Sequence, residues 1–249
     1  MSARTLFISD LHLSPADPAT VAAFRHFLAH TAKQAQALYI LGDLFEYWLG
    51  DDQLDDDFYS GIARELAQLA DSGVALYFMA GNRDFLPGQR FAREARLRII
   101  ADPSVINPAG QALLLAHGDA YCTDDLAYQR YRKLARNRLV QWIWLHLPRR
   151  MRDREAAKLR QKSQAMNRHK AMMIMDVNDV AIEAAMQKCT CQVLIHGHTH
   201  KPAVHIYPSG TRYVLPDWHQ GQGGYLLLDG ARLSLHRLDG QPLTAPVQP

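Results

Sequence analysis

Five short motifs in this chain contain the residue types that bind divalent metal ions. In chain order they are Asp10-x-His12, Gly42-Asp43, Gly81-Asn82-Arg83-Asp84, His117-Gly118-Asp119 and Gly197-His198-Thr199-His200. A mixed set of oxygen and nitrogen ligands suits Mn, Fe, Zn or Co better than Ca or Mg. Two such ions side by side are a common device for hydrolysing phosphate esters and anhydrides. The motifs therefore predict a two-metal phosphohydrolase.

Each residue type has a distinct use in such a site. Asp10 and His12 are two residues apart, so an extended backbone carries both to the same side, where both can bind one ion. Asp43 can bridge two ions through its two oxygens, and Asn82 adds a carbonyl oxygen without adding charge. Taken singly the motifs are weak, because a Gly-Asn pair is also common in turns. Their number and order carry the prediction.

Every motif directly follows an apolar run that is typical of a buried strand. These runs are Leu6–Ser9, Tyr39–Leu41, Phe78–Ala80, Leu113–Leu115 and Val193–Ile195. Active sites of α/β folds lie in loops at the carboxyl ends of the strands. We therefore expect the five motifs to meet on one rim.

The surrounding pattern predicts an α/β fold. Helical spacing of apolar residues covers 19–36 and 58–69, between strands near 5–9, 38–41 and 74–79. The order β-α-β-α-β favours a parallel or mixed sheet covered by helices. After His200, short runs at 204–207, 212–215, 225–229 and 233–238 alternate with Gly-containing turns and predict a meander of antiparallel strands.

Composition places the chain among ordinary globular proteins. It has 249 residues, of which 48% are hydrophobic, and no apolar run approaches the roughly 18 to 20 residues of a membrane-spanning helix. Neither the length nor the cleavage site of a secretory signal is present at the N-terminus. Three cysteines, Cys122, Cys189 and Cys191, suggest neither a disulfide framework nor a zinc knuckle. We expect a reducing, cytoplasmic setting.

The net charge of +3 hides a strongly basic segment. Residues 129–170 hold 14 of the 28 Lys and Arg but two of the 25 Asp and Glu, so this segment carries +12 and the remainder −9. The segment follows the His117 motif and reads as two or three helices, 125–147 and 149–170, with a break at Pro148. Basic, aromatic helices at that position are expected to overhang the site and to favour anionic partners.

Together these motifs resemble the signature of the calcineurin-like metallophosphoesterases. The resemblance implies a four-layer α/β/β/α sandwich and covers residues 4 to about 236, apart from the basic insertion. Most members have His after Gly-Asn, whereas this chain has Arg83. A guanidinium cannot donate a proton near neutral pH, but it can bind phosphate oxygens bidentately. Arg83 therefore suits a diphosphate better than an alkyl ester.

Longer stretches of the sequence narrow the resemblance to one branch of this family. They are similar to the branch of that family that cleaves the diphosphate of UDP-2,3-diacylglucosamine in lipid A biosynthesis, giving UMP and 2,3-diacylglucosamine 1-phosphate. The stretches are Ser9–Leu13, Gly42–Glu46, Gly81–Phe85, His117–Asp119, Cys122–Asp125 and His196–His200. This resemblance implies two Mn²⁺ per chain and attack of a metal-activated water on the uridylyl phosphorus.

The resemblance also implies residue roles. One ion would be held by Asp10, His12, Asp43 and His200, and the other by Asp43, Asn82, His117 and His198. Catalytic roles would belong to Asp43, Asn82, Arg83 and His198. Substrate contacts would come from Asn82, Arg83, Asp125, Ser163, Asn167, Lys170 and His198. His196 would support the ligands or be structural.

Within the basic segment, two observations favour binding over a merely solvated surface. Ser163, Asn167 and Lys170 are spaced to share one polar helical face. Trp142, Trp144 and neighbouring apolar residues interleave with the cations, which suits an acylated, anionic substrate and the cytoplasmic surface of the inner membrane. Nucleic acid is the competing ligand. Met172, Met173 and Met175 fit core packing better than acyl contacts.

We thus expect a metallophosphoesterase core of residues 1–124 and 171–238, a helical cap of 125–170 and a flexible tail of 239–249. The chain is predicted to be a peripheral, monomeric inner-membrane hydrolase that binds no nucleic acid. A metal-dependent nuclease or nucleotide phosphodiesterase is the alternative enzyme, and a non-catalytic scaffold is the alternative outside enzymes.

Overall fold

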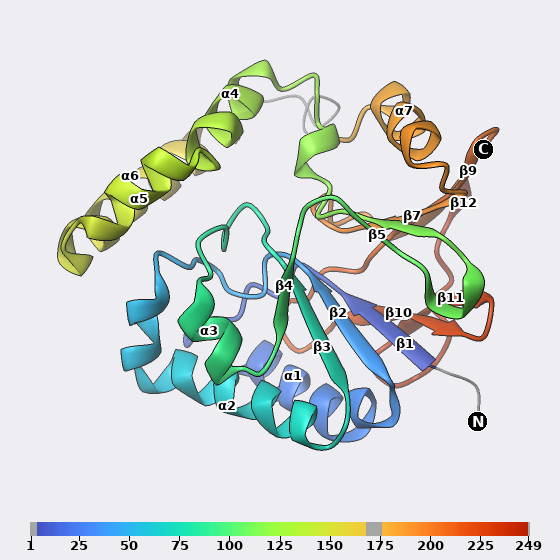
Figure 1. The fold of residues 1–249 in the computed structure, drawn as a ribbon, viewed down its shortest axis with the longest axis horizontal. Coiled ribbons are helices and arrows are strands. Elements are labelled where there is room, and N and C mark those ends of the chain that lie inside the picture. Colours follow the sequence, from blue (N-terminus) through green and yellow to red (C-terminus); the bar gives the residue numbers. More distant parts are fainter. Residues whose placement is uncertain (1–3, 168–175, 249) are drawn as a thin grey trace.

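Two six-stranded β-sheets pack face to face in the computed structural model, and helices cover both outer faces (Figure 1). The structure describes residues 4–167 and 176–248, with side chains left out for 109, 159–167 and 248. Three buried apolar clusters separate the layers: one under the helices of the first sheet, one between the sheets, and one under a helix of the second. The four-layer α/β/β/α architecture expected from the sequence is confirmed.

The first sheet has the strand order β11-β10-β1-β2-β3-β4. Its strands are β1 (Arg4–Ile8), β2 (Ala37–Leu41), β3 (Ala75–Met79), β4 (Arg98–Ile100), β10 (Gly224–Asp229) and β11 (Arg232–Arg237). Strands β1 to β4 are parallel, and β10 pairs antiparallel with both β1 and β11. The carboxyl ends of β1, β2 and β3 therefore lie side by side.

The second sheet has the order β12-β8-β9-β7-β6-β5. Its strands are β5 (Ser104–Ile106), β6 (Leu113–Leu115), β7 (Val193–His196), β8 (Ala203–Tyr207), β9 (Gly210–Val214) and β12 (Val247–Gln248). The parallel neighbours β6 and β7 are buried along their whole length, which explains their uninterrupted apolar sequences. Their ends bring the His117 and His198 motifs together.

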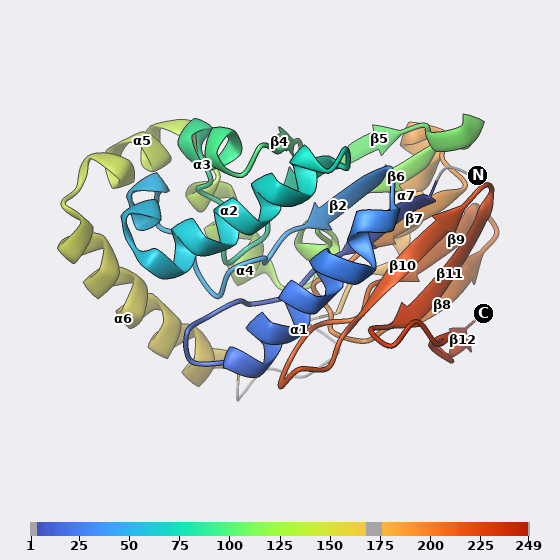
Figure 2. The same ribbon diagram turned by 90° about the horizontal axis from the view of Figure 1, so that it is seen from below.

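Helices α1 (Pro18–His30), α2 (Asp57–Asp71) and α3 (Gln89–Glu94) cover the first sheet, and α7 (Asp179–Cys189) covers the second (Figures 1 and 2). Asp17 caps α1 by accepting from the backbone N–H of Thr20 at 3.1 Å. The buried residues of α1 include Phe24 and Phe27, spaced so that they lie on one face. That face packs on the sheet that carries three of the metal motifs.

Three further helices form an arm beyond the sandwich, as both ribbon views show (Figures 1 and 2). They are α4 (Leu126–Ala135), α5 (Arg138–His146) and α6 (Arg149–Asn167). The sequence predicts two or three helices here with a break at Pro148, and the structure has three, with a further break after Ala135 that was not predicted. Asn137 explains the break, because its side chain accepts from the backbone N–H groups of Leu139 and Val140 and so starts a new helix.

The expected C-terminal meander is wrong in its connections. Strands β8 and β9 form a hairpin in the second sheet, whereas β10 and β11 form a hairpin in the first. The chain crosses between the sheets after Val214, and β10 then pairs with β1. Three short strands, β4, β5 and β12, were not predicted, the last of them within the expected flexible tail of 239–249. The first helix ends at His30 instead of reaching residue 36.

The segment after β11 is held to the second sheet in part. Val247 and Gln248 form β12, which pairs with β8, and Leu243 packs against the cluster between the sheets. Within the described ranges, no helix has the length and apolar character needed to cross a membrane.

Candidate metal centre

The predicted ligands come together from both sheets. Asp10, Asp43 and Asn82 follow β1, β2 and β3, and His117 and His198 follow β6 and β7. Backbone hydrogen bonds join neighbouring loops: the N–H of His12 donates to the carbonyl of Asp43 at 2.9 Å, and Gly197 donates to His117 at 2.9 Å. The rim expected from the strand ends is therefore formed by residues far apart in sequence.

One half of the centre contains Asp10, His12 and His200. One ligand atom from each of these residues lies within 4.8 Å of the others. The Nε2 atoms of His12 and His200 are 3.4 Å apart, and His200 Nε2 is 3.5 Å from Asp10 Oδ1. Asp10 is fully buried. Such convergence of an oxygen and two nitrogens fits one cation.

The other half forms around the side-chain oxygen of Asn82. His117 Nε2 and His198 Nδ1 each lie 2.9 Å from Asn82 Oδ1. Asp43 stands between the halves, since its Oδ2 is 3.9 Å from His12 Nε2 and its Oδ1 is 3.8 Å from His117 Nε2. One carboxylate thus offers an oxygen to each half, which is the arrangement that a bridging ligand requires.

A hydrogen bond to the backbone fixes the tautomer of His117. Its Nδ1 donates to the carbonyl of Leu41 at 2.9 Å, so Nε2 is left as the ligand atom. Burial alone would lower its pKa, but the carboxylates of Asp43, Asp10 and Asp119 outweigh burial and raise the pKa to about 9. For His198 burial dominates, with His117 adding to it, and the pKa falls to about 4. The electrostatic field of these carboxylates therefore favours a positive charge at His117.

Twelve buried polar side-chain atoms of the described residues lack a hydrogen-bond partner, and two of them belong to predicted ligands. These two are Asp10 Oδ1 and His12 Nδ1, the latter 3.6 Å from Glu46 Oε2. Buried polar atoms are normally satisfied, and a cation would satisfy a carboxylate oxygen that faces two histidines. The residues present fit a pair of metal ions.

The backbone at the ligands is unusual. Among described residues other than glycine, eight have positive φ, and five of them are predicted ligands: Asp10, His12, Asp43, His198 and His200. Such angles cost of order 1–3 kcal/mol each and cluster at functional sites. Asp10 and His12 therefore reach one centre through left-handed turns and not through the extended backbone expected from their spacing.

Two glycines allow the loops to approach. A Cβ on Gly81 would lie 2.1 Å from Asp43 Oδ1, and a Cβ on Gly197 would lie 2.1 Å from Asp10 Oδ2. Both distances are far below van der Waals contact. Gly-Asn and Gly-His in the motifs thus reflect packing against the carboxylates of neighbouring loops.

Asp84 is a supporting residue to which the sequence analysis assigns no role. Its fully buried carboxylate accepts from the backbone N–H groups of Asp43, Leu44, Phe45 and Gly81, at 2.7–3.3 Å. Burial and Asp43 raise its pKa to about 8, and the backbone donors oppose that rise. Asp84 ties the Asp43 loop to the Asn82 loop. Its place at the end of the Gly-Asn-Arg-Asp motif was the available signal.

Arg83 lies at the edge of the centre. Its backbone N–H donates to Asp43 Oδ1 at 2.8 Å, and its guanidinium Nη1 is 3.8 Å from Glu46 Oε1. The Arg83 side chain is 38% exposed, so its guanidinium can reach an entering anion. Glu46, which the sequence analysis also leaves without a role, contacts both Arg83 and His12.

Of the predicted substrate residues in the helical arm, only Asp125 has a described side chain. Asp125 is buried and caps α4, accepting from the N–H of Tyr128 at 3.0 Å. The side chains of Ser163 and Asn167 lie outside the described part, as do Lys170, Met172, Met173 and Met175 entirely. Their predicted contacts stay predictions.

His196 belongs to neither half of the centre. Its ring is fully buried, and its Nδ1 lies 2.8 Å from the carbonyl oxygen of Gly197. Burial, followed by the charge of Arg212, lowers its pKa to about 3, so the ring is neutral. This environment is consistent with a supporting or structural residue.

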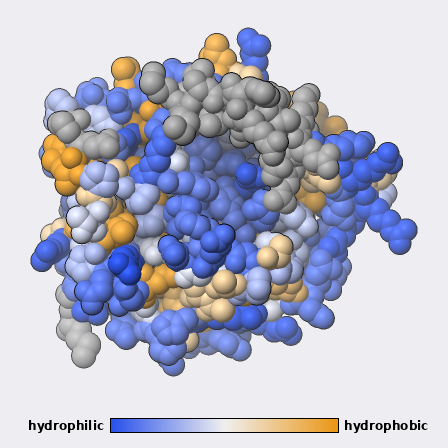
Figure 3. Space-filling model, turned by 180° about the vertical axis from the view of Figure 1, so that it is seen from behind, coloured by the Kyte–Doolittle hydropathy of each residue, from blue (hydrophilic) through white to orange (hydrophobic). Residues whose placement is uncertain are grey.

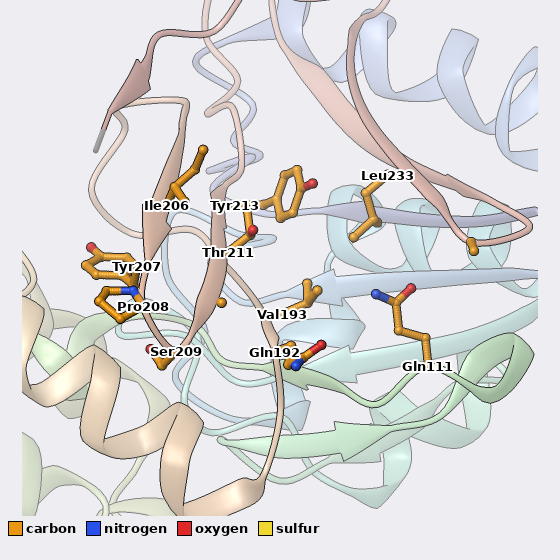
Figure 4. A pocket seen from close by; sticks show the side chains of 12 residues that line it. Gln111, Gln192, Val193, Ile206, Tyr207, Pro208, Ser209, Thr211, Tyr213 and Leu233 are labelled. Carbon is orange, nitrogen blue, oxygen red and sulfur yellow. The ribbon is translucent and has the colours of Figure 1, made fainter.

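Figure 3 shows the face behind that of Figure 1, where hydrophilic side chains line a hollow. A separate pocket of about 440 Å³ lies at the opposite end of the strands from the centre (Figure 4). Gln111 and Gln192, which precede β6 and β7, line it together with Ser209 and Leu233. It contains no predicted ligand.

The fold and the donor set define a metal-dependent phosphoesterase. Residues 3–202 match the model of the calcineurin-like phosphoesterase family, and the chain belongs to that family. It is therefore a hydrolase whose family implies a dinuclear metal site, for which this chain has the candidate ligand groups.

Within the family, the chain is similar to proteins named UDP-2,3-diacylglucosamine hydrolase. The one from Pseudomonas paraeruginosa is 49% identical over 228 residues, which cover 90% of this chain and 94% of that one. The one from Edwardsiella ictaluri is 44% identical over 96% of this chain and 93% of its own. Among solved structures, a conserved uncharacterized protein from Streptococcus pneumoniae has a TM-score of 0.48 at 11% identity, covering 98% of this chain and 94% of that one.

Proposed function

We propose that this chain hydrolyses the diphosphate of UDP-2,3-diacylglucosamine to UMP and 2,3-diacylglucosamine 1-phosphate, a reaction of lipid A biosynthesis. The observation that carries the proposal is its similarity to hydrolases named for this substrate, at 44–49% identity over nine-tenths or more of both chains. The convergent oxygen and nitrogen donors support the same reaction type, since no other described group offers them.

Two ions, by this proposal Mn²⁺, bind the two halves of the centre. Asp10, His12, Asp43 and His200 hold one, while Asp43, Asn82, His117 and His198 hold the other. Ions bound at these positions would supply positive charge for the phosphoryl oxygens and would lower the pKa of a bound water. The mixed oxygen and nitrogen donors are compatible with Mn²⁺.

The chain's own residues orient the diphosphate. Arg83 binds phosphate oxygens bidentately from the edge of the centre, and His198 stabilises charge beside it. Asp125, Ser163, Asn167 and Lys170 contact the nucleotide and sugar phosphate. Water adds to the uridylyl phosphorus, and the bond from that phosphorus to the bridging oxygen breaks. The water oxygen therefore ends in UMP, and the bridging oxygen leaves with 2,3-diacylglucosamine 1-phosphate.

The reaction is tested by incubating the purified chain and Mn²⁺ with UDP-2,3-diacylglucosamine in H₂¹⁸O and weighing both products by mass spectrometry. We expect UMP carrying one ¹⁸O and an unlabelled lipid monophosphate. Label in the lipid product contradicts attack at the uridylyl phosphorus. Cleavage of single-stranded DNA, with the lipid nucleotide untouched, instead supports a nuclease.

We further propose that α5 binds the cytoplasmic surface of the inner membrane peripherally. Its side chains Leu139, Trp142 and Ile143 are 65%, 58% and 50% exposed, beside the cation Arg138. Apolar side chains with adjacent cations suit an anionic lipid surface. Trp144 is different, because it packs against the core cluster.

Co-sedimentation with vesicles of anionic and of neutral lipid tests this surface. The double variant Trp142→Ala with Ile143→Ala should lose most of its binding to anionic vesicles. Val180→Ala, which trims an even more exposed apolar side chain on α7, is the control and should bind as the wild type does. Equal binding by all three proteins contradicts the role of α5.

A further inference from the structure

Helix α4 and its C-cap residue, Arg136, direct three side chains towards the loops of the centre. Tyr128, Arg132 and Arg136 are spaced four residues apart, which places them along one side of the helix. They meet two carboxylates of the core, Asp102 and Asp119, whose side chains are at most 2% exposed. This cluster is part of the contact between the arm and the sandwich.

The hydrogen bonds in the cluster are short and numerous. Asp119 Oδ2 accepts from the Tyr128 hydroxyl at 2.7 Å and from Arg132 Nε at 2.8 Å. Asp102 Oδ2 accepts from Arg132 Nη2 at 2.9 Å, and Arg136 Nη1 lies 3.3 Å from the same oxygen. Two guanidinium groups thus neutralise two buried carboxylates, and the loss of one partner leaves an uncompensated buried charge.

From these residues, contacts continue to the ligands assigned to one ion. Asp102 Oδ1 accepts from the backbone N–H of His117 at 3.1 Å. Arg136 Nη2 donates to the carbonyl of Ala80 at 3.2 Å and to that of Gly81 at 3.3 Å, immediately before Asn82.

Tyr128 completes the set, because its ring stacks on that of His198, with centroids 6.2 Å apart and planes 27° apart. Asn82, His117 and His198 are therefore each supported from α4. Within the described part of the chain, Tyr128, Arg132 and Arg136 make no hydrogen bond, ion pair or ring contact with Asp10, His12 or His200.

We propose that Tyr128, Arg132 and Arg136 are positioning residues for the ion held by Asn82, His117 and His198, so that the seating of α4 sets the affinity of that ion. The inference rests on the ligand set of the proposed function and is independent of the substrate. Groups that orient metal ligands typically contribute 10- to 100-fold to metal affinity or activity. Because only one half of the centre is contacted, the two ions should respond differently.

The test is calorimetric titration of the full-length, chelator-treated protein with MnCl₂. In Arg136→Gln, we expect one of two binding steps to weaken by about 10-fold or more, while the other keeps its wild-type affinity. With Mn²⁺ present, Arg136→Gln should lower kcat by a larger factor than it changes KM. Arg136→Lys keeps the positive charge but lacks the planar set of guanidinium N–H donors. It should recover part of the lost affinity for Mn²⁺.

Arg130→Gln is the matched control, because it removes the same charge from an exposed position of the same helix. It should titrate as the wild type does. If Arg136→Gln does not fold, Tyr128→Phe decides, since it removes one hydroxyl and keeps the ring; we expect the same step to weaken, by a smaller factor.

Wild-type affinity for both ions in the folded variants overturns the positioning role. Equal weakening of both steps also overturns it, since that result indicates a general loss of structure. Fewer than two ions in the wild-type chain contradicts the ligand set itself. Failure of this inference is thereby distinguished from failure of the metal site.

Discussion

At the scale of single residues, Arg83 lies between the candidate metal ligands and the proposed phosphate-binding edge. Its backbone N–H holds Asp43 Oδ1, the oxygen nearer to His117, while its guanidinium reaches outward beside Glu46. Glu46 also stands 3.6 Å from His12 Nδ1. One arginine and one glutamate thus contact both Asp43, the proposed bridging carboxylate, and His12, a candidate metal ligand.

Replacement of Arg83 by His should reduce kcat for UDP-2,3-diacylglucosamine by roughly 100-fold, because a developing phosphate charge loses a positioned cation. Arg83→Lys keeps the charge but loses bidentate binding, so an intermediate rate is expected. Steady-state kinetics with Mn²⁺ measure both. Wild-type kcat in Arg83→His contradicts the phosphate-binding role.

Asp84→Asn should destabilise the fold and the centre together. The amide offers one acceptor oxygen where two oxygens now receive four backbone N–H groups, so buried donors are left unpaired at about 1–3 kcal/mol each. Urea unfolding of the metal-free protein measures the loss. Unchanged stability shows that these loops hold without the carboxylate.

The identity of the ligands follows from residue types at strand ends, but their geometry does not. Motif order predicts that Asp10, Asp43, Asn82 and His117 meet, and the structure brings them together. The left-handed turns at Asp10 and His12 depend on contacts with loops far along the chain, which local spacing does not contain. Asp102 was missed because its partners are 15 and 30 residues away.

At the scale of elements, helix ends depend on local capping. Asp17 accepts from both the N–H and the hydroxyl of Thr20 and from the N–H of Gln220, so it joins α1 to the loop before β10. The break at Asn137 is a second case, and it directs Arg136 to the Gly81 loop. Strands next to the motifs were predicted within one or two residues because burial dictates their sequence. Which strands β8 to β11 pair with depends on contacts far along the chain, and the sequence did not predict these pairings.

Asp17→Ala should lower the free energy of unfolding by about 1 kcal/mol at pH 7. The hydrogen bonds from Thr20 lower the pKa of Asp17 below its usual 3.8, so its contribution is present above that pH and is lost as the pH falls below it. Urea unfolding of metal-free protein at pH 7 and pH 3 should show the gap between wild type and variant shrinking. Asp17→Asn, which does not titrate, is the control; a gap for Asp17→Ala that stays constant with pH refutes the charged cap.

At the scale of the whole molecule, the centre joins two sheets that are otherwise packed through apolar side chains. Asp10, Asp43 and Asn82 come from the first sheet, and His117, His198 and His200 from the second. The same two sheets exchange strands along the chain, since β10 and β11 return to the first after β7 to β9 have completed the second. Ions bound here would connect positions up to 190 residues apart, from Asp10 to His200.

Bound Mn²⁺ should therefore raise the thermal stability of the whole chain. A free concentration of about 100 times the Kd adds about 2.7 kcal/mol per ion, which raises the Tm of a protein of this size by roughly 5–10 °C. Calorimetry with Mn²⁺ and with chelator measures the shift. His200→Ala should show a smaller shift, and a Tm that is insensitive to Mn²⁺ contradicts a site formed in the folded state.

The left-handed backbone at five ligand positions has a consequence for divergence. Asp, Asn and His adopt this conformation more readily than most residues, and glycine adopts it without penalty, whereas β-branched residues are strongly disfavoured. A descendant released from metal chemistry would keep these turns, because they are part of the sandwich rim. It would accumulate Gly and Asn at positions 10, 12, 43, 198 and 200 and gain stability by doing so. Loss of the ions would thus be recognisable in the sequence, as Gly and Asn at these five positions, long after the activity had gone.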